Sequence, residues 1–497
     1  MAKPVKSQLV RGLTLIAAIS IVVGNVVGTG VFLKARVMTC NVGTPWMVLI
    51  VYIVAGLLSL AGALSYAELA AMMPRAGGEY VFLREAYGPR WAFLYGWMSF
   101  FIGKAGSQAA LGVQFASFLN ITLGGVLTGV YFSRNVLGYP VPFGKLQLVA
   151  LGSIVVVTAI NCLAVKVSGG VAAGLTAIKI AVVLLVGIGA FIFARGADWS
   201  HFAQSNMGGT CEGVSAIART GFAGFVAAMM GALWAYDGWN NVTLVAGEVQ
   251  NPQRNLPRAL IGGMLLIAAL YVMVNFAYFY TLTPTTIASV STASSVATEV
   301  AKTFLGPLAV TLIAVALLFS TFGTLHTSIL TGARVPYAMS QDRLFFQRLS
   351  KVSPHTHVPV GALIAQAVWA SILIIIFSSS FDILTDYAIF GLWIFYALVT
   401  ASVFVLRRRL PDAERPYRTW GYPAVPVLFI AAAAVLLSKT LWDVRGDAVT
   451  GITLILHGDL APGIVTIVKD PPLFGLILIA IGFPVYWYWA RHNRRTE

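Results

Sequence analysis

Charged residues are scarce in this chain, and histidine and cysteine are scarcer still. Asp, Glu, Lys and Arg make up 10% of its 497 residues, and there are six histidines and three cysteines. Soluble domains carry about 25% charged residues, so this composition excludes a soluble domain. Cys40, Cys162 and Cys211 lie too far apart in sequence to suggest a metal site. No metal and no other cofactor is therefore predicted.

Motifs for phosphate binding and for catalysis are also missing. The chain has no Walker-type loop, which excludes ATP-driven pumping, and no Ser-His-Asp set can be assembled on one side of a membrane. We therefore predict that the protein is not an enzyme. Its net charge of +15 is spread over many loops rather than gathered in one domain. This distribution argues against nucleic-acid binding.

Hydrophobic residues, in contrast, make up 58% of the chain, and the mean hydropathy is +0.83. A helix needs about 20 apolar residues to cross a bilayer. On that rule we predict an all-α integral membrane protein with about twelve transmembrane helices. The expected spans are residues 13–38, 46–73, 90–120, 146–166, 170–194, 217–247, 259–282, 305–333, 358–378, 383–406, 424–442 and 473–490.

The basic residues set the expected orientation. With the N-terminus inside, 21 of the 33 Lys and Arg fall in cytoplasmic loops and tails. The positive-inside rule then makes both termini cytoplasmic, in a multi-pass protein of the cell (cytoplasmic) membrane. The parts outside the ten-span core are the tails at 1–12 and 491–497, a cytoplasmic loop at 407–423 and the last two spans at 424–490.

Cys40 and Cys211 both face outside on this map, whereas Cys162 lies in an apolar span. Outside thiols can form a disulfide, because that environment is oxidising. The sequence leaves open whether these two do so.

Two of the predicted spans are interrupted near their middle. Residues 24–30 (GNVVGTG) break the first span, and Gly231 together with residues 235–241 (AYDGWNN) breaks the sixth. An unpaired backbone group inside hydrocarbon costs several kcal/mol, so such a break persists only where it lines a cavity or meets a ligand. Two breaks of this kind predict the binding site of a transporter.

The first break offers groups that suit an α-amino acid. The outer half-helix is expected to begin near Thr29, where free N–H groups and the positive end of the dipole attract a carboxylate. Gly28 and Gly30 would let the ligand approach. Carbonyls at Val26 and Val27 are suited to an ammonium group, as are those of Trp234, Ala235 and Asp237 in the sixth span. The alternative is that the glycines only permit close helix packing.

Several motifs, taken in order, resemble the amino acid/polyamine/organocation superfamily and especially its L-type amino acid transporter branch. They cover the first ten spans well and the last two loosely. The principal ones are GNVVGTGVF from residue 24, SYAEL from 65, MPRAGGEY from 73, WAYDGWN from 234 and RPY from 415.

The resemblance implies a LeuT-like fold with two inverted repeats of five spans, at 13–194 and 217–406, within a transport core at 13–406. It also implies that main-chain groups at both breaks hold the substrate. The corresponding positions are Val26, Gly28, Thr29, Gly30, Trp234 and Asp237, and Thr29 stands where serine is common.

Two lysines are predicted inside the membrane. Lys179 lies near the middle of the fifth span, where an unpaired charge is costly, so it is expected to be functional or paired unless it snorkels. In sodium-independent relatives, a lysine here takes the place of a sodium ion and bridges the first and eighth spans. Lys104 in the third span has Asp237 as its expected partner, and together they would shape side-chain selectivity or form a structural ion pair.

Aromatic residues of the sixth span are candidates for the side-chain pocket or a gate. Trp234 and Trp239 are positioned to cap the site, with Tyr236 between them. Ordinary packing, or an interfacial belt, is the alternative for Trp239. Glu68, Glu79, and Glu248 with Arg254 and Arg258, are expected to anchor helices or form an inner gate.

These observations predict a sodium-independent secondary amino acid transporter working by alternating access, through exchange or proton symport. A non-transporting amino acid sensor is the alternative. The loop between the third and fourth spans has no cysteine for linking an accessory subunit, so none is expected to be required. The sequence leaves the amino acid, the coupling mode and the oligomeric state open.

Overall fold

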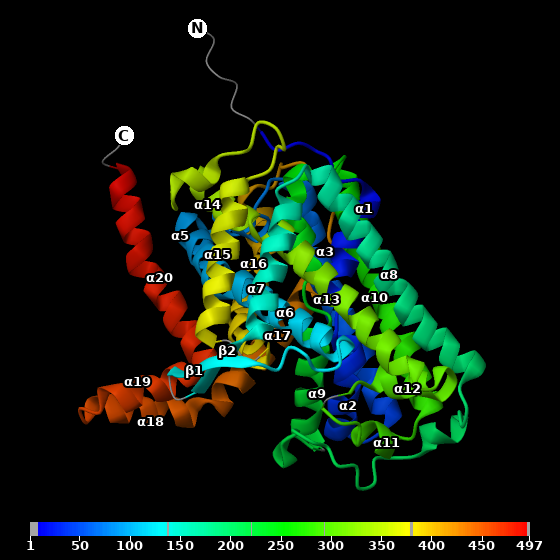
Figure 1. The fold of residues 1–497 in the computed structure, drawn as a ribbon. Coiled ribbons are helices and arrows are strands. Elements are labelled where there is room, and N and C mark those ends of the chain that lie inside the picture. The colour runs from blue at the N-terminus through cyan, green and yellow to red at the C-terminus, as the bar shows by residue number, and fades with distance from the viewer. Residues whose placement is uncertain (1–7, 137–138, 220, 293, 378–380, 495–497) are drawn as a thin grey trace.

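The computed structural model describes residues 8–136, 139–219, 221–292, 294–377 and 381–494. The predicted tails at 1–12 and 491–497 fall partly outside these ranges. Helices occupy each of the twelve predicted spans (Figure 1). They are α1 (Leu15–Val26) with α2 (Gly30–Val42), α3 (Pro45–Met72), α5 (Pro89–Met98) with η1 (Ser99–Gly103) and α6 (Lys104–Thr122), α7 (Lys145–Asn161), α8 (Val165–Phe193), α9 (Gly221–Ala235) with η4 (Trp239–Glu248), α10 (Pro252–Thr281), α13 (Leu308–Gly332), α15 (Val360–Phe377), α16 (Phe381–Arg409), α17 (Ala424–Asp443) and α20 (Pro471–Arg494).

Eight helical segments in the described part of the chain are each long and apolar enough to cross a membrane. Leu15–Val42 is one of these, because α1 and α2 follow one another across the first break. α7 and α15 are apolar but shorter. The fold is therefore that of a multi-pass helical membrane protein, as the hydropathy predicts.

Several connections that we expected to be loops contain structure of their own. β1 and β2 form one antiparallel hairpin between α6 and α7, in a fold that is otherwise helical as predicted. Strand β1 has the sequence VYFSRNV, whose valines and aromatics favour extended backbone. The added elements are α4 (Glu79–Tyr87), β1 (Val130–Val136), β2 (Tyr139–Gly144), α11 (Pro284–Ala288), α12 (Val296–Leu305), α14 (Arg334–Gln341), α18 (Arg445–Leu456) and α19 (Leu460–Lys469). Figure 1 shows α18 and α19 lying across the direction of the long helices.

Both predicted interruptions are present. α1 ends at Val26 and α2 begins at Gly30, which leaves residues 27–29 between them. α9 ends at Ala235, and after a turn the chain continues as the 3₁₀ helix η4. Gly238 makes this turn possible with φ +101°, a conformation that favours glycine. Gly231 was expected to break the sixth span as well, but it lies inside α9 because its N–H and C=O remain in a regular helix.

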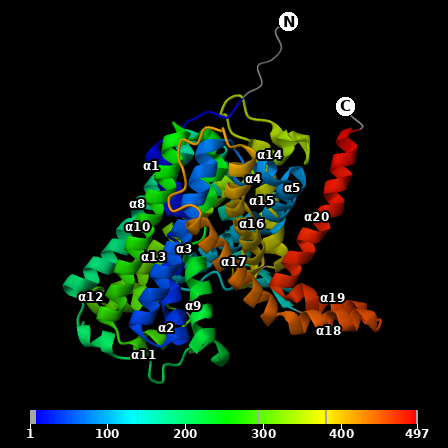
Figure 2. The same ribbon diagram turned by 180° about the vertical axis from the view of Figure 1, so that it is seen from behind.

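The long helices pack in two groups, which Figures 1 and 2 show from opposite sides. In one group α3 and α10 contact each other and both contact η4, while α1 contacts α10 and η4. In the other group α6, α7, α13 and α15 contact one another. α8 touches both groups, through α1 and α10 on one side and α13 on the other. The two breaks lie in the first group.

Ion pairs join helices on the face where α1 begins, here called the N-terminal face (Figure 1). Glu248 binds Arg334 through two hydrogen bonds of 2.7 Å, and both side chains are fully buried. This contact links the end of η4 to the start of α14. We expected Glu248, together with Arg254 and Arg258, to anchor helices or form an inner gate; Glu248 does join two helices, and Arg334 is the partner that occupies both of its carboxylate oxygens.

Glu68 makes a second such link on the same face. Its carboxylate accepts hydrogen bonds from Arg407 at 2.9 and 2.7 Å and from the Thr419 N–H at 2.7 Å. Arg415 lies 3.5 Å from it as well. These contacts tie α3 to the end of α16 and the loop that follows, in agreement with the predicted anchoring role.

A disulfide joins helix and loop on the opposite face. Cys40, near the end of α2, is bonded to Cys211 in the loop before α9, so the pairing that the sequence left open is formed. Cys162 is a free thiol.

Candidate functional site

A cavity of about 110 Å³ lies where the two breaks meet. All seven residues proposed from sequence for substrate binding line it: Val26, Gly28, Thr29, Gly30, Trp234, Ala235 and Asp237. The two breaks also touch directly. A Cβ on Gly30 would lie 2.9 Å from the Cβ of Ala235, and one on Gly238 would lie 3.1 Å from the Cβ of Asn25. Gly30 therefore serves close packing as well as lining the cavity.

Gly28 differs from Gly30 in its surroundings. The nearest atoms to a Cβ on Gly28 are the Thr324 hydroxyl at 3.7 Å and the Val26 carbonyl at 3.9 Å. These are ordinary van der Waals distances, so packing alone does not require glycine at this position. The side of Gly28 that faces the cavity is open to a ligand.

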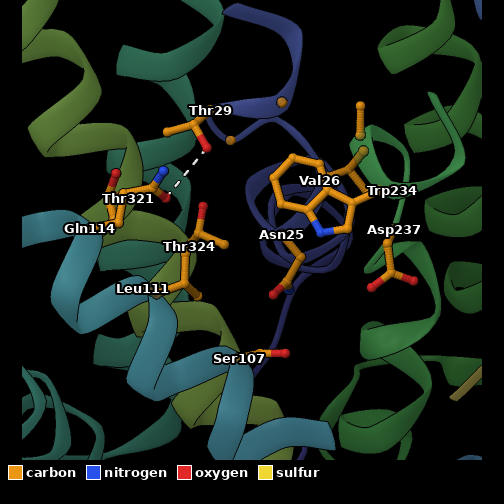
Figure 3. A pocket seen from close by; sticks show the side chains of 13 residues that line it. Asn25, Val26, Thr29, Ser107, Leu111, Gln114, Trp234, Asp237, Thr321 and Thr324 are labelled. Atoms are coloured by element: carbon orange, nitrogen blue, oxygen red, sulfur yellow. Dashed lines mark hydrogen bonds between the residues drawn. The ribbon is translucent and has the colours of Figure 1, made fainter. Parts of the chain in front are cut away.

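The start of α2 supplies free donors. No hydrogen bond within the described part of the chain takes up the N–H groups of Thr29, Gly30 or Val31. These belong to the first turn of a helix, where such groups have no partner in the helix and the dipole is positive. The Thr29 hydroxyl donates to Gln114 Oε1 at 3.3 Å (Figure 3). This edge of the cavity is suited to an anion.

The carbonyls at the opposite edge are more occupied than we expected. The Val26 carbonyl accepts from the Gly28 N–H at 2.8 Å and from the Tyr271 hydroxyl at 2.9 Å. The same hydroxyl lies 2.9 Å from the Ala235 carbonyl, and the Trp234 carbonyl accepts from the Asp237 N–H at 3.1 Å. The Val27 carbonyl accepts from the Ser320 hydroxyl at 3.4 Å. The prediction that these carbonyls stand unpaired is thus wrong for Val26, Val27, Trp234 and Ala235, because buried backbone groups acquire partners.

Tyr271 was not identified from sequence, although it joins both breaks. It extends from α10 and is fully buried. A tyrosine hydroxyl has one proton, so it can donate fully to one of its two carbonyls at a time. A tyrosine inside an apolar span is a common core residue, and the sequence therefore gave no signal for it.

Lys179 lies beside the cavity rather than in its lining. Its Nζ donates to the Gly24 carbonyl and to the Thr324 hydroxyl, both at 2.6 Å, and only 2% of the residue is exposed. Gly24 belongs to α1 and Thr324 to α13, so the lysine joins the first span to the eighth. The alternative of snorkelling does not describe this buried position.

Helices α6 and α13 contribute lining residues that sequence reasoning missed. Ser107, Leu111 and Gln114 follow one another at helical spacing on α6. Thr321 and Thr324 do so on α13. Figure 3 shows these side chains facing the first break, with Asp237 and Trp234 across the cavity. Hydroxyl and amide groups at intervals of three or four residues were the signal available in the sequence.

Three of the proposed pocket or gate residues lie outside the cavity lining. Trp239 packs against Tyr66, with ring centroids 4.8 Å apart, and Tyr236 packs against Tyr271 at 4.9 Å. Both rings are buried in the core instead of facing the ligand space. The core packing considered as an alternative for Trp239 is what the structure shows.

Lys104 has a hydrogen-bond partner besides the charge expected near it. Its Nζ donates to the side-chain oxygen of Asn241. The negative charges of Glu79 and Asp237 also act on it, although Lys104 and Asp237 form no ion pair within 4.0 Å among the described residues. Asp237 instead accepts a hydrogen bond of 3.1 Å from the Tyr396 hydroxyl. Because Asn241 and Asp237 flank the same turn, the lysine still belongs to the polar surroundings of the second break.

Comparison with known proteins agrees with this arrangement. A family model described as amino acid permease matches residues 13–450. The serine/threonine exchanger SteT of Bacillus subtilis is 32% identical over 87% of this chain and 92% of its own. The human b(0,+)-type amino acid transporter 1 is 30% identical over 89% of this chain and 86% of its own. The mouse large neutral amino acids transporter small subunit 2 is 27% identical over 90% and 80%.

The last of these relatives is named as a subunit, so the comparison gives no support to the expectation that an accessory subunit is unnecessary. The relatives are transporters and exchangers, which agrees with the absence of a catalytic set. The match over nearly the whole core, with the ordered motifs and the two broken helices, places this chain in the amino acid permease family of the amino acid/polyamine/organocation superfamily.

Proposed function

We propose that this protein exchanges small polar amino acids, with serine and threonine as the first candidates, across the cell membrane without sodium. The observation that carries the proposal is the cavity between the two breaks, lined by main-chain groups of both. Its size and its hydroxyl and amide lining suit a small polar side chain. The serine/threonine exchanger among the relatives supports the same substrate class.

The amino acid would bind with its carboxylate at the free N–H groups of Thr29, Gly30 and Val31. Its ammonium would face the carbonyls of Val26 and Ala235. Because the Tyr271 hydroxyl already lies within hydrogen-bond distance of both carbonyls, the ammonium would share or displace that hydroxyl. Asp237 adds a carboxylate on the same side. Thr321, Thr324 and Gln114 remain to meet the substrate's hydroxyl.

Independence from sodium rests on Lys179. Its ammonium is held between a backbone carbonyl and a hydroxyl, which are oxygen ligands of the kind that a sodium ion would need. A fixed charge there fills the place of a bound cation, so transport needs no ion gradient at this position. The same amine is a candidate proton carrier, and proton symport is therefore the competing mode.

Alternating access would use the two helix groups. We propose twelve spans with two inverted repeats, both termini in the cytoplasm, and a bundle of the first, second, sixth and seventh spans moving against the third, fourth, eighth and ninth. The contacts of α1, α3, α10 and η4 on one side and of α6, α7, α13 and α15 on the other support this division.

Uptake by the purified protein in liposomes tests the proposal. Labelled serine and threonine should enter liposomes preloaded with serine, and empty liposomes should take up little. Replacing sodium by choline should leave the rate unchanged. A requirement for a proton gradient with no need for internal amino acid would replace exchange by symport. Binding without any flux, in either condition, would favour the sensor.

The same preparation tests the stand-alone prediction. The absence of a cysteine between α6 and α7 argues against a disulfide-linked partner. The purified chain should therefore transport by itself. Inactivity that is reversed by a co-expressed membrane protein would show that a second subunit is needed.

A further inference from the structure

A second cavity, of about 260 Å³, lies between the outer half-helices α2 and α9. It is on the face opposite the start of α1, where Figure 1 shows both helices. Its lining shares no residue with that of the central cavity. The lining consists of Lys34, Val37, Met38 and Asn41 from α2, Ala227 and Gly231 from α9, and Gly213, Val214, Ser215 and Ala218 from the preceding loop.

The loop that completes this outer cavity is anchored to the protein at several points. The disulfide fixes Cys211 to α2. Arg36 donates to the Glu212 carbonyl at 2.6 Å, and Arg219 donates to the Val214 carbonyl at 2.6 Å. The cavity is therefore bounded by residues with defined partners and not by a loose segment.

Lys34 is the one charged residue of the lining. Its Nζ lies 4.7 Å from the centre of the Trp234 ring, and no described residue forms an ion pair or hydrogen bond with it. Trp234 in turn lines the central cavity. Lys34 thus stands at the wall between the two cavities, with its charge available to a ligand on the outer side.

Asn41 provides an unused acceptor in the same cavity. Its Oδ1 is buried without a hydrogen-bond partner in the described part of the chain, and the residue is 2% exposed. A buried acceptor without a partner costs about 1–3 kcal/mol, so a donor from a ligand would be favourable there. Asn41 and Lys34 are seven residues apart, which puts them on one side of α2 and about 10 Å apart along its axis.

From this geometry we infer that the outer cavity is a second binding site for an amino acid on its way to the central cavity. The carboxylate binds the Lys34 ammonium, and the Asn41 oxygen accepts a hydrogen bond from the amino group during entry. Because about two helical turns separate these groups, one molecule of serine uses them in succession. The choice of serine as ligand rests on the proposed function. The proposal of a site is supported independently by the residues that line the outer cavity.

Chemical protection of Lys34 tests this site directly. The purified full chain would be treated with a water-soluble amine-acetylating reagent, with and without L-serine, and the modified lysines quantified by mass spectrometry. Serine near saturation should slow acetylation of Lys34 by about fivefold. Lys302 is the internal control, because it lies on the neighbouring α12, is half exposed and pairs with Glu299. Its rate should not change.

A variant with a filled central cavity separates the two sites. Gly28→Leu places a side chain in the central cavity without touching Lys34, and protection should persist in it. Equal acetylation with and without serine would overturn the inference, as would protection that disappears in Gly28→Leu. Should that variant aggregate, Thr324→Leu fills the same space from α13. Acetate that protects as well as serine would show a general anion site and overturn the amino acid assignment.

Transport kinetics supply a second, independent measurement. Lys34→Gln should raise the KM for serine offered from this face by about fivefold, and Lys34→Arg should stay near wild type. Lys302→Gln removes the same charge from the same face and should leave the KM unchanged. A wild-type protein that does not transport serine yet still shows protection of Lys34 would refute the proposed function and leave the outer site standing.

Discussion

The two breaks differ in what holds them. The first is fastened by groups from other helices, since Lys179 and Thr324 both contact the Gly24 carbonyl. The second has contacts from other helices too, from Tyr396 and Lys104, and adds two hydrogen bonds of its own, from the Asp237 N–H to the Trp234 carbonyl and from the Asn241 N–H to the Gly238 carbonyl. Free N–H groups remain at the first break, where α2 begins.

This difference assigns separate tasks to the two breaks. A break that is held by hydrogen bonds from other helices can keep its N–H donors directed at the ligand site even when no ligand is bound. A break that also has hydrogen bonds of its own can turn as a unit with η4. Tyr271 connects the two, because its hydroxyl reaches a carbonyl of each. The first break would therefore fix the substrate, and the second would carry movement.

Removing the hydrogen bonds that other helices make to the first break should have the largest effect. Lys179→Ala deletes two charge-assisted hydrogen bonds, each worth about 1.5–3 kcal/mol, so serine exchange should fall by at least about 100-fold. The measurement is counterflow of labelled serine in liposomes. Because the change also leaves the Gly24 carbonyl with one weak partner, the melting temperature should fall as well.

A matched variant distinguishes the loss of these hydrogen bonds from a general loss of protein stability. Lys166→Ala removes a lysine from the first turn of the same helix, at an exposed position, and should transport normally. If Lys179→Ala were to keep wild-type kinetics, the first break would not depend on its hydrogen bond to Lys179. The proposed difference in what holds the two breaks would then be wrong.

Removing the connection between the breaks should have an intermediate effect. Tyr271→Phe leaves the Ala235 carbonyl without its hydroxyl donor, at a cost of about 1–3 kcal/mol, and kcat/KM should fall by about tenfold. Tyr278→Phe is the control. Tyr278 lies on the same helix and is fully buried, and its hydroxyl has no partner within the described residues. A similar loss of kcat/KM in both variants would mean that any buried tyrosine hydroxyl on this helix matters, and not the connection that Tyr271 makes between the breaks.

Sequence reasoning located the breaks and their main-chain groups because glycine-rich interruptions of apolar spans are rare and costly. It found Lys179 for the same reason, since a charge in an apolar run stands out. It missed Tyr271, because a tyrosine in a helical core carries no such signal. It left Trp239 open between a gate and core packing, and it did not identify Arg334 as the partner of Glu248, since a side chain's direction depends on the tertiary neighbours of its helix. Arg334 lies 86 residues from Glu248.

The smallest effect is expected from a variant that changes only the proposed contact between the ligand and the first break. Gly28→Ala adds a methyl group that meets protein atoms only at 3.7 Å or more, so folding and stability should be unchanged. On the proposed binding mode the methyl group would face the substrate, and the KM for serine should therefore rise by about three- to tenfold with little change in kcat. Gly262→Ala on α10, where a Cβ meets nothing within 4 Å, is the control. An unchanged KM in Gly28→Ala would mean that the substrate does not lie against this part of the chain, and the anion-binding role of the first break would have to be given up.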